Sequence, residues 1–299
     1  MCLSIKAGDM TPLRQRMLGA LELRGMAVRT QEAYIDAVAR LGRHFGRSPA
    51  LLSGDEVQGY LLHLLRDRHL ARSSVNQYGC AFRFLYGTVL AQPPEAFQIP
   101  LPRAPQALPE VLARLELAQL FASACHFKAR SFLTLAYGTG LRVSELCHLR
   151  VEHLDSHADR MCIHVVHGKG GKDRYVPLSA EALEAARLWW RVARPRQWLF
   201  TGSRDPTLPL DAGMAQRWYR WASARAGITK QGGIHTLRHC YATHLLEAGV
   251  DLHSLQQWLG HGHISTTMRY LHLAQPDAPD GARAKPLSLL AALPTITRH

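Results

Sequence analysis

The sequence lacks the features of a membrane or secreted protein. No run of about 18 uncharged apolar residues occurs among its 299 residues, so we expect no membrane span. Residues 1–16 contain no apolar secretory segment, which predicts a cytosolic protein. The six cysteines never form a CxxC pair and therefore indicate reduced thiols rather than a disulfide framework.

Acidic residues are also scarce, and this scarcity points to a polyanionic partner. Only 23 Asp and Glu stand against 36 Lys and Arg, which gives a formal net charge of +13. The excess is spread along the chain, because residues 1–103 carry 13 basic and 8 acidic residues and the remainder carries 23 and 15. Double-stranded DNA is the natural partner, although a solvated basic surface fits the charge alone.

A hydrophobic share of 47% is enough for a buried core and excludes a wholly disordered chain. Residues 92–109 hold six of the sixteen prolines and predict an extended linker. We therefore expect a helical domain over 10–91, a second domain over 110–275 and a tail over 276–299.

Apolar spacing in the first domain predicts a small bundle of four helices. Leu13, Met17 and Leu21 mark the first helix. Thr30 is the expected N-cap of the second, and Ser53 with Glu56 forms a capping-box pair before the third. The fourth helix follows residues 73–74.

The second domain is predicted to be mainly helical with one small antiparallel sheet. Residues 115–137 have a helical pattern that a Gly-Thr-Gly turn ends, and 161–165 and 175–178 alternate as strands around a basic tip, which indicates a hairpin. Further helices are expected at 181–192, 212–226, 237–248, 252–259 and 266–272.

Four segments of this domain bring together residues suited to chemistry on a phosphodiester: Arg142, Lys169, His235 with Arg238, and His261 with Tyr270. Guanidinium groups can bind phosphate oxygens and offset the charge of a pentavalent phosphorane. Histidines can donate to phosphate or move protons, and a lysine can protonate a leaving alkoxide. A tyrosine phenol can attack phosphorus and hold the DNA covalently. No carboxylate pair suited to metal accompanies them, so we expect neither a metal nor another cofactor.

Residue type alone does not identify which lysine and which tyrosine carry the chemistry, or whether Arg142 does. Lys172 lies in the same turn as Lys169, and Tyr219 or Tyr241 has the same phenol as Tyr270. Arg142 can equally cap or pair locally, since an Arg after a helix-breaking turn commonly does so.

A zinc site is a further alternative. His235, His239, Cys240 and His244 fall near metal-ligand spacing, but the i, i+4 pairs lie on different faces and no HExxH or CxxC motif is present. We expect His239, His244 and His263 to pack or to contact phosphate instead.

The strings TGLRVSEL, HGKGGKDRYVPL, HTLRHCYATHLL and LGHGHISTTMRYLH resemble, in order and spacing, the signature boxes of tyrosine site-specific recombinases of the phage integrase and Xer family. The resemblance covers about residues 11–275. It implies a SAM-like helical core-binding domain, a catalytic domain, and closure of the two as a clamp on duplex DNA. Because the sequence begins almost directly with this core-binding domain, we expect the additional arm-binding domain of some phage integrases to be absent.

The resemblance assigns roles to the residues that match the boxes. Arg142 and Arg238 match the two catalytic arginines, and Glu145 matches the acidic residue that supports the site. Lys169 matches the hairpin lysine that protonates the 5′ leaving oxygen.

The remaining boxes supply the nucleophile and its histidines. His235 matches the acceptor of the tyrosine proton, His261 matches a hydrogen-bond donor to the scissile phosphate, and Tyr270 matches the nucleophile that forms a 3′-phosphotyrosyl link.

The sequence therefore predicts a site-specific DNA recombinase or integrase that acts without metal or ATP, in a synaptic tetramer on DNA. A type IB topoisomerase, a non-catalytic DNA-binding protein and a metal-dependent nuclease are the alternatives. We also expect the apolar segment 287–293, stranded beyond a flexible connector, to dock on a neighbouring protomer.

Overall fold

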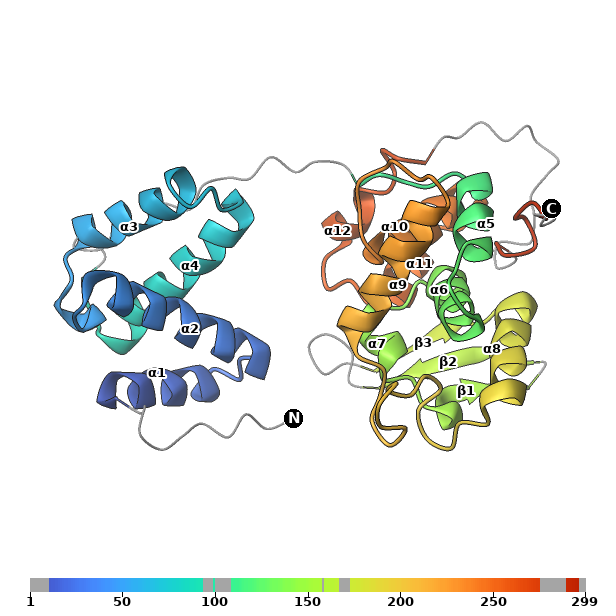
Figure 1. The fold of residues 1–299 in the computed structure, drawn as a ribbon, viewed down its shortest axis with the longest axis horizontal. Coiled ribbons are helices and arrows are strands. Elements are labelled where there is room, and N and C mark those ends of the chain that lie inside the picture. The colour runs from blue at the N-terminus through green and yellow to red at the C-terminus, as the bar shows by residue number, and fades with distance from the viewer. Residues whose placement is uncertain are drawn as a thin grey trace. The chain divides into compact units, whose positions relative to one another are not determined.

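The computed structural model describes residues 11–93, 99, 109–157, 159–166, 173–274 and 289–295. The chain forms two compact units, Met1–Gln106 and Ala107–His299, each of which is described by itself (Figure 1). In the part of the chain that is described, no helix is long and apolar enough to cross a membrane. The fold is mainly helical with a small antiparallel sheet, which confirms the predicted fold class.

Within residues 11–93, the N-terminal unit consists of α1 (Pro12–Leu23), α2 (Val28–Phe45), η2 (Pro49–Leu51), α3 (Gly54–Arg66), α4 (Arg72–Phe84) and the π-helical η3 (Leu85–Val89). The predicted capping box begins α3, because the Ser53 amide donates to Glu56 at 2.9 Å and the Glu56 amide donates to Ser53 Oγ at 3.3 Å. The expected N-cap Thr30 is wrong. The N-cap of α2 is Ala27, three residues earlier, and it makes no side-chain capping bond, because the strongly amphipathic helix is held by packing.

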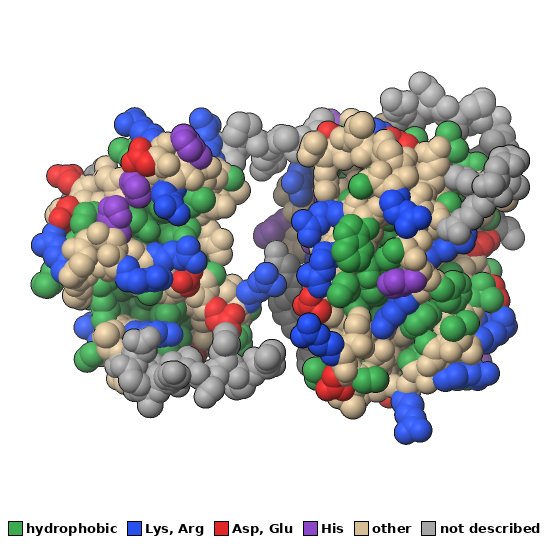
Figure 2. Space-filling view, in the orientation of Figure 1, with side chains coloured by type: hydrophobic (Ala, Val, Ile, Leu, Met, Phe, Trp, Pro, Cys, Tyr) green, Lys and Arg blue, Asp and Glu red, His purple; other side chains and the backbone are tan. Residues whose placement is uncertain are grey.

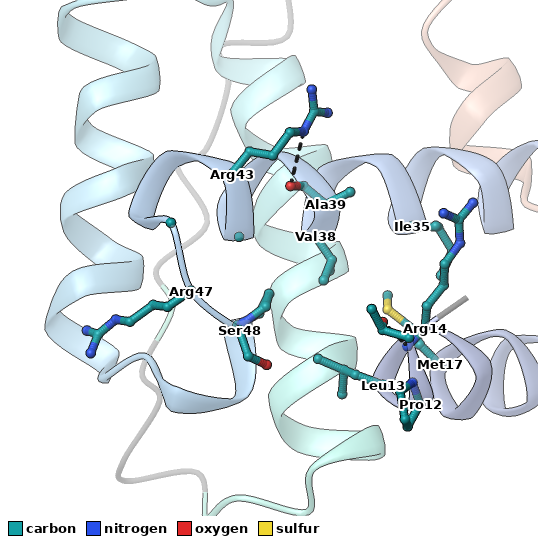
Figure 3. Close-up of a pocket in the computed structure, with 14 residues that line it drawn as sticks. Pro12, Leu13, Arg14, Met17, Ile35, Val38, Ala39, Arg43, Arg47 and Ser48 are labelled. Carbon is teal, nitrogen blue, oxygen red and sulfur yellow. Dashed lines mark hydrogen bonds between the residues drawn. The ribbon is translucent and has the colours of Figure 1, made fainter. Parts of the chain in front are cut away.

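A hollow of about 1020 Å³ lies between α1, α2 and η2 (Figure 3). Its lining includes Met17, Ile35 and Val38 from the core of this unit, with Arg14 and Arg43 among its polar members. Arg43 donates to the carbonyl of Ala39 on its own helix, as the dashed line in Figure 3 shows. None of the residues expected to carry chemistry lines this hollow, so the candidate active site lies elsewhere.

The described helices of the second unit are α5 (Arg114–Ala122), α6 (Phe127–Thr139), α7 (Val143–Cys147), η4 (Val151–His153), α8 (Ala180–Ala193), α9 (Ala212–Arg225), α10 (His235–Glu247), α11 (Leu252–Leu259) and α12 (Ile264–Met268). The single helix expected over 115–137 is in fact two. The chain breaks at 123–126, where Nδ1 of His126 accepts the Ala129 amide at 3.0 Å and starts α6. Helix α12 ends four residues earlier than expected and leads into turns.

The sheet has the order β1-β2-β3, with β1 (Leu154–Asp155), β2 (Cys162–Val165) and β3 (Arg174–Pro177) paired antiparallel. Strands β2 and β3 are the predicted hairpin, in a register that pairs Val165 with Arg174. Residues 167–172 of its tip lie outside the described residues. The short β1 was not predicted, since two residues carry no detectable alternation.

Buried residues from α5–α11 and the sheet form one core in this unit. Leu289 joins that core at 5% exposure, and Leu290 and Leu293 pack against it. The described part of the tail, 289–295, therefore packs on its own unit in the single chain. Basic side chains lie on the visible face of both units (Figure 2).

Candidate active site

The turn between α6 and α7 places Arg142 at the start of a helix. Gly140 ends α6 in the left-handed region at φ +60°, and a Cβ there would lie 2.2 Å from a ring carbon of Tyr241. Only glycine fits this position. Arg142 is then the extended N-cap of α7, and its amide donates to the Glu145 carboxylate at 2.8 Å.

Glu145 is the anionic centre of the site. Its carboxylate accepts Arg142 Nη1 at 2.8 Å and two hydrogen bonds from Arg174, at 2.9 and 2.7 Å. The side chain is only 9% exposed. Burial raises its pKa, but the Arg174 and Arg142 hydrogen bonds and charges outweigh this and lower the pKa to about 2. Glu145 is therefore ionised at neutral pH and holds both arginines in place.

Arg174 was not predicted as a site residue. It is the first residue of β3, 10% exposed at its side chain, and its Nε donates to the Trp258 carbonyl on α11 at 2.8 Å. Arg174 thus ties the sheet to α7 and α11. It stands in the quoted string HGKGGKDRYVPL, but nothing in that string indicates that its guanidinium turns inward to a buried carboxylate.

The second arginine, Arg238, is buried on α10. Its Nη1 donates to the Gly140 carbonyl at 2.7 Å, and its Nη2 contacts the Leu259 carbonyl and lies 3.2 Å from Nε2 of His261. Burial, followed by the charge of Arg142, lowers its pKa to about 10, so it stays cationic at neutral pH. Arg142 Nη2 donates to the Gly260 carbonyl at 2.9 Å, so each guanidinium binds the carboxyl end of a neighbouring helix.

His261 connects Arg238 to the tyrosine. An Arg guanidinium only donates, so Nε2 of His261 accepts, and Nδ1 carries the hydrogen toward Thr267 Oγ1 at 2.9 Å. Burial and the charges of Arg238 and Arg142 lower its pKa to about 3, which makes it neutral. Its ring stacks on Tyr270, with centroids 6.2 Å apart and planes at 18°.

Tyr270 follows α12 and is 3% exposed. Its hydroxyl lies 3.0 Å from Nδ1 of His239. Burial raises the pKa of the phenol, whereas the charges of Arg238, Arg269 and Arg142 lower it. The site therefore surrounds a neutral tyrosine with cationic groups that favour its ionised form.

The comparisons with known proteins agree with this geometry. Residues 110–276 match the Phage integrase family, and residues 13–95 match the Phage integrase, N-terminal SAM-like domain. The chain is 38% identical over 268 residues to the putative integrase/recombinase y4qK of Sinorhizobium fredii, covering 89% of this chain and 85% of that protein. It is 35% identical to an Escherichia coli integrase/recombinase, covering 91% and 90%.

The chain belongs to the phage integrase family. A lambda integrase tetramer bound to a Holliday junction has the same fold, with a TM-score of 0.71 at 18% identity over 86% of this chain and 76% of that one. The predicted function is confirmed: the protein is a site-specific tyrosine recombinase acting on DNA. The family does not support the topoisomerase, nuclease or non-catalytic alternatives.

The structure gathers most of the residues that the recombinase boxes indicated. Arg142, Glu145, Arg238, His261 and Tyr270 are joined in a continuous chain of contacts. His235 starts α10 and is exposed, and its side chain makes no hydrogen bond within the described residues. Burial of part of the ring and the charges of Arg238 and Arg142 lower its pKa. Lys169 and its rival Lys172 lie outside the described residues.

Three of the four residues of the zinc hypothesis have separate partners in this recombinase. His239 bonds to Tyr270, the Cys240 sulfur accepts the Leu112 amide at 3.2 Å, and Nδ1 of His244 pairs with the Tyr137 hydroxyl at 2.9 Å. Among the described side chains, no group of three or more His, Cys, Asp or Glu is arranged to hold a metal ion.

Proposed function

We propose that this recombinase cuts one DNA strand with Tyr270, which leaves a 3′-phosphotyrosyl link and a free 5′-hydroxyl. Arg142 and Arg238 bind the non-bridging oxygens of the scissile phosphate, and Lys169 protonates the leaving 5′ oxygen. A 5′-hydroxyl from a partner strand then attacks the link and releases the tyrosine. The energy of the ester is conserved, so the reaction needs no ATP.

One observation carries this proposal: both guanidiniums, the His261 imidazole and the Tyr270 phenol belong to one contact network. Arg238 lies 3.2 Å from His261, whose ring stacks on Tyr270, while Arg142 bonds to the residue before His261. A phosphate that binds the two arginines therefore meets the phenol. Electrostatic stabilisation by such donors typically gives the largest share of rate enhancement.

DNA changes the role of His261 in this proposal. In the free site Nε2 accepts from Arg238 and cannot donate to phosphate. An anionic phosphate between the arginines raises the pKa of His261 and stabilises a hydrogen on Nε2. His261 then donates to the phosphate, and exposed His235 contacts it from the start of α10.

The same proposal extends to the whole chain. Residues 10–91 form a core-binding domain that grips the DNA backbone with its arginines, 92–109 form the linker, and 110–275 form the catalytic domain. Recombination proceeds in a synaptic tetramer, as the junction-bound lambda integrase tetramer suggests. Because its substrate is DNA, we place the activity in the cytoplasm.

A suicide-substrate experiment tests this function. The protein is incubated with a pool of nicked duplexes that carry a randomised site, and adducts that resist SDS are isolated and sequenced. We expect the 5′-labelled strand to stay with the protein and the other fragment to leave with a free 5′-hydroxyl.

Substitution of the tyrosines identifies the nucleophile. Tyr270→Phe should abolish the adduct. Tyr241→Phe and Tyr219→Phe should retain it, since the Tyr241 hydroxyl has no hydrogen-bond partner among the described residues and the Tyr219 hydroxyl bonds to Thr236 and Ser223, away from the arginines. An adduct that persists in Tyr270→Phe contradicts the assignment.

A further inference from the structure

His239, which the boxes did not assign, contacts the reacting atom. Its Nδ1 lies 3.0 Å from the Tyr270 hydroxyl, and the two rings are 5.7 Å apart and inclined at 44°. His239 follows Arg238 directly on α10, so the backbone that positions the phosphate-binding arginine also positions this imidazole. Tyr270 itself is almost fully buried, which leaves bulk water little access to its hydroxyl.

His235, the residue that the resemblance assigned to proton transfer, is placed differently. It lies one turn earlier on the same helix, exposed, and its side chain makes no hydrogen bond among the described residues. Residues at i and i+4 share a helix face, so the sequence alone does not decide whether His235 or His239 accepts the tyrosine proton. The tertiary structure brings only His239 to the phenol oxygen.

The protonation states of His239 and Tyr270 favour a hydrogen bond in which the Tyr270 phenol donates to the His239 imidazole. Burial, together with the charges of His235, Arg238 and Arg269, lowers the pKa of His239 to about 4, so the ring is neutral at pH 7. A neutral imidazole has one nitrogen that accepts. With the hydrogen on Nε2, Nδ1 accepts from the phenol, which is the better donor of the two.

We propose that Nδ1 of His239 accepts the Tyr270 proton during strand cleavage and returns it during rejoining. This inference rests on the proposed function of Tyr270 as nucleophile. In the forward step the bond from Tyr270 Oη to phosphorus forms, the bond from phosphorus to O5′ breaks, and the phenol proton moves to His239. The 5′ oxygen takes its proton from a separate acid, for which Lys169 is proposed. In the reverse step Tyr270 leaves and recovers the proton.

Substrate binding strengthens this base. The titratable and charged groups that face His239 are His235 and Arg238 on its own helix and Arg269 beside Tyr270. The two arginine cations, and His235 when it is protonated, oppose protonation of the His239 imidazole in the free chain. A phosphodiester anion at the arginines offsets their charge, so the basicity of Nδ1 rises only when DNA is in place. Proton transfer is thereby coupled to DNA binding.

The first test is single-turnover cleavage of one nicked duplex recovered from the randomised pool. His239→Ala removes the acceptor, and His239→Asn places an amide oxygen near the position of Nδ1, where it accepts a hydrogen bond but takes no proton. We expect both variants to cleave about 100-fold more slowly than wild type, with unchanged DNA affinity. A wild-type rate in His239→Asn overturns the proposal, because positioning alone would then suffice.

Two further readouts separate proton transfer from a structural role. On a duplex with a 5′-bridging sulfur, which leaves without protonation, the His239 defect should persist while the defect of Lys169→Ala disappears. The wild-type rate should fall on the acid side as His239 is protonated, and His239→Asn should lose that limb. An acid limb that remains unchanged in His239→Asn overturns the assignment.

The matched control lies on the same helix. His244 makes the same kind of contact, Nδ1 to the Tyr137 hydroxyl at 2.9 Å, within the core. His244→Asn should change the melting temperature and leave the cleavage rate of the folded protein unchanged. If wild type forms no adduct, or Tyr270→Phe retains one, the proposed function fails. If the adduct forms at Tyr270 and the His239 variants match wild type, only this inference fails.

Discussion

Arg174 forms a two-pronged ion pair with Glu145, with Nη1 2.9 Å from one carboxylate oxygen and Nη2 2.7 Å from the other. Arg142 donates to the same carboxylate from its side chain and from its amide. One buried anion therefore fixes Arg142, the N-cap of α7, to the first residue of β3. This relationship makes Glu145 a positioning residue for Arg142.

Glu145→Gln should reduce both stability and cleavage. The amide keeps the size of the side chain but leaves two guanidiniums near each other without a counter-charge, and breaking a buried pair costs about 3–5 kcal/mol. We expect a fall of that size in the free energy of unfolding and at least about a 10-fold slower cleavage. Urea unfolding and single-turnover cleavage measure the two effects.

The control for this substitution is Glu152→Gln. Glu152 pairs with Arg150 at 3.0 Å, but the two side chains are 67% and 40% exposed, so its loss should cost less than about 1 kcal/mol. Equal losses in the two variants contradict a special role for Glu145.

Gly140→Ala should disturb Arg238 from a distance. An alanine at φ +60° costs about 1–2 kcal/mol, and the contact of its Cβ with the Tyr241 ring adds about 1–3 kcal/mol. The shift also moves the carbonyl that accepts Arg238 Nη1. We expect slower cleavage together with a lower melting temperature.

Gly227→Ala separates backbone strain from this contact. Gly227 has φ +69° with open space at the Cβ position. The Gly227→Ala variant should therefore lose only the stability that alanine costs at positive φ, about 1–2 kcal/mol, and keep full cleavage activity. A Gly140→Ala variant as stable and as active as Gly227→Ala contradicts the importance of the Tyr241 contact.

Acid should destabilise the protein through its buried histidines. Burial lowers the pKa of His244 to about 4, from an unfolded value of 6.5. Between these values the unfolded chain binds more protons, so stability falls as pH drops from about 6.5 to 4 and levels off below. From pH 7 to pH 5, His244 alone should account for about 2 kcal/mol of lost stability.

Chemical unfolding at pH 7 and pH 5 checks this dependence. His244→Gln should lessen the acid loss by that amount. Tyr137→Phe should cost about 1 kcal/mol at both pH values through the missing hydrogen bond and keep the wild-type slope, because His244 stays buried. A slope unchanged by His244→Gln contradicts the prediction.

Periodicity and capping rules, which read only neighbouring residues, predicted the helices and strands whose position depends on the local sequence. Apolar periodicity located the helices, alternation located β2 and β3, and Ser53 with Glu56 located the start of α3. Thr30 was wrong as a cap because packing extends α2 to Val28. The break before α6 was missed because His126, an uncommon N-cap, supplies the capping bond.

The candidate site shows what the sequence could not predict. The four boxes indicated which segments meet, but not which side chains touch. Arg174 and His239 acquire their roles from what packs opposite them: the Glu145 carboxylate on α7 and the Tyr270 hydroxyl after α12. Helical spacing gives the face on which a residue lies and not its tertiary neighbour.

The C-terminal segment supplies the last prediction. Leu289 is buried in the core of the catalytic unit, and a Cβ on Gly138 of α6 would come within 2.9 Å of Leu290 Cδ1. Burying a leucine contributes about 1.5–3 kcal/mol. Truncation after Gln275 should therefore lower the free energy of unfolding by a few kcal/mol, and Leu289→Asp should do so too.

The exposed Leu208 provides the control, since Leu208→Asp places a charge at a side chain that is 57% exposed and should change little. If the segment also docks on a neighbouring protomer, the truncated protein will still form the Tyr270 adduct on a single nicked site but will not assemble two sites into a synaptic complex. Gel mobility of paired sites measures that step. Unchanged stability after truncation contradicts the packing of the segment on its own unit. Unchanged synapsis contradicts docking between protomers, because a neighbouring protomer that receives the segment loses this contact when the segment is removed.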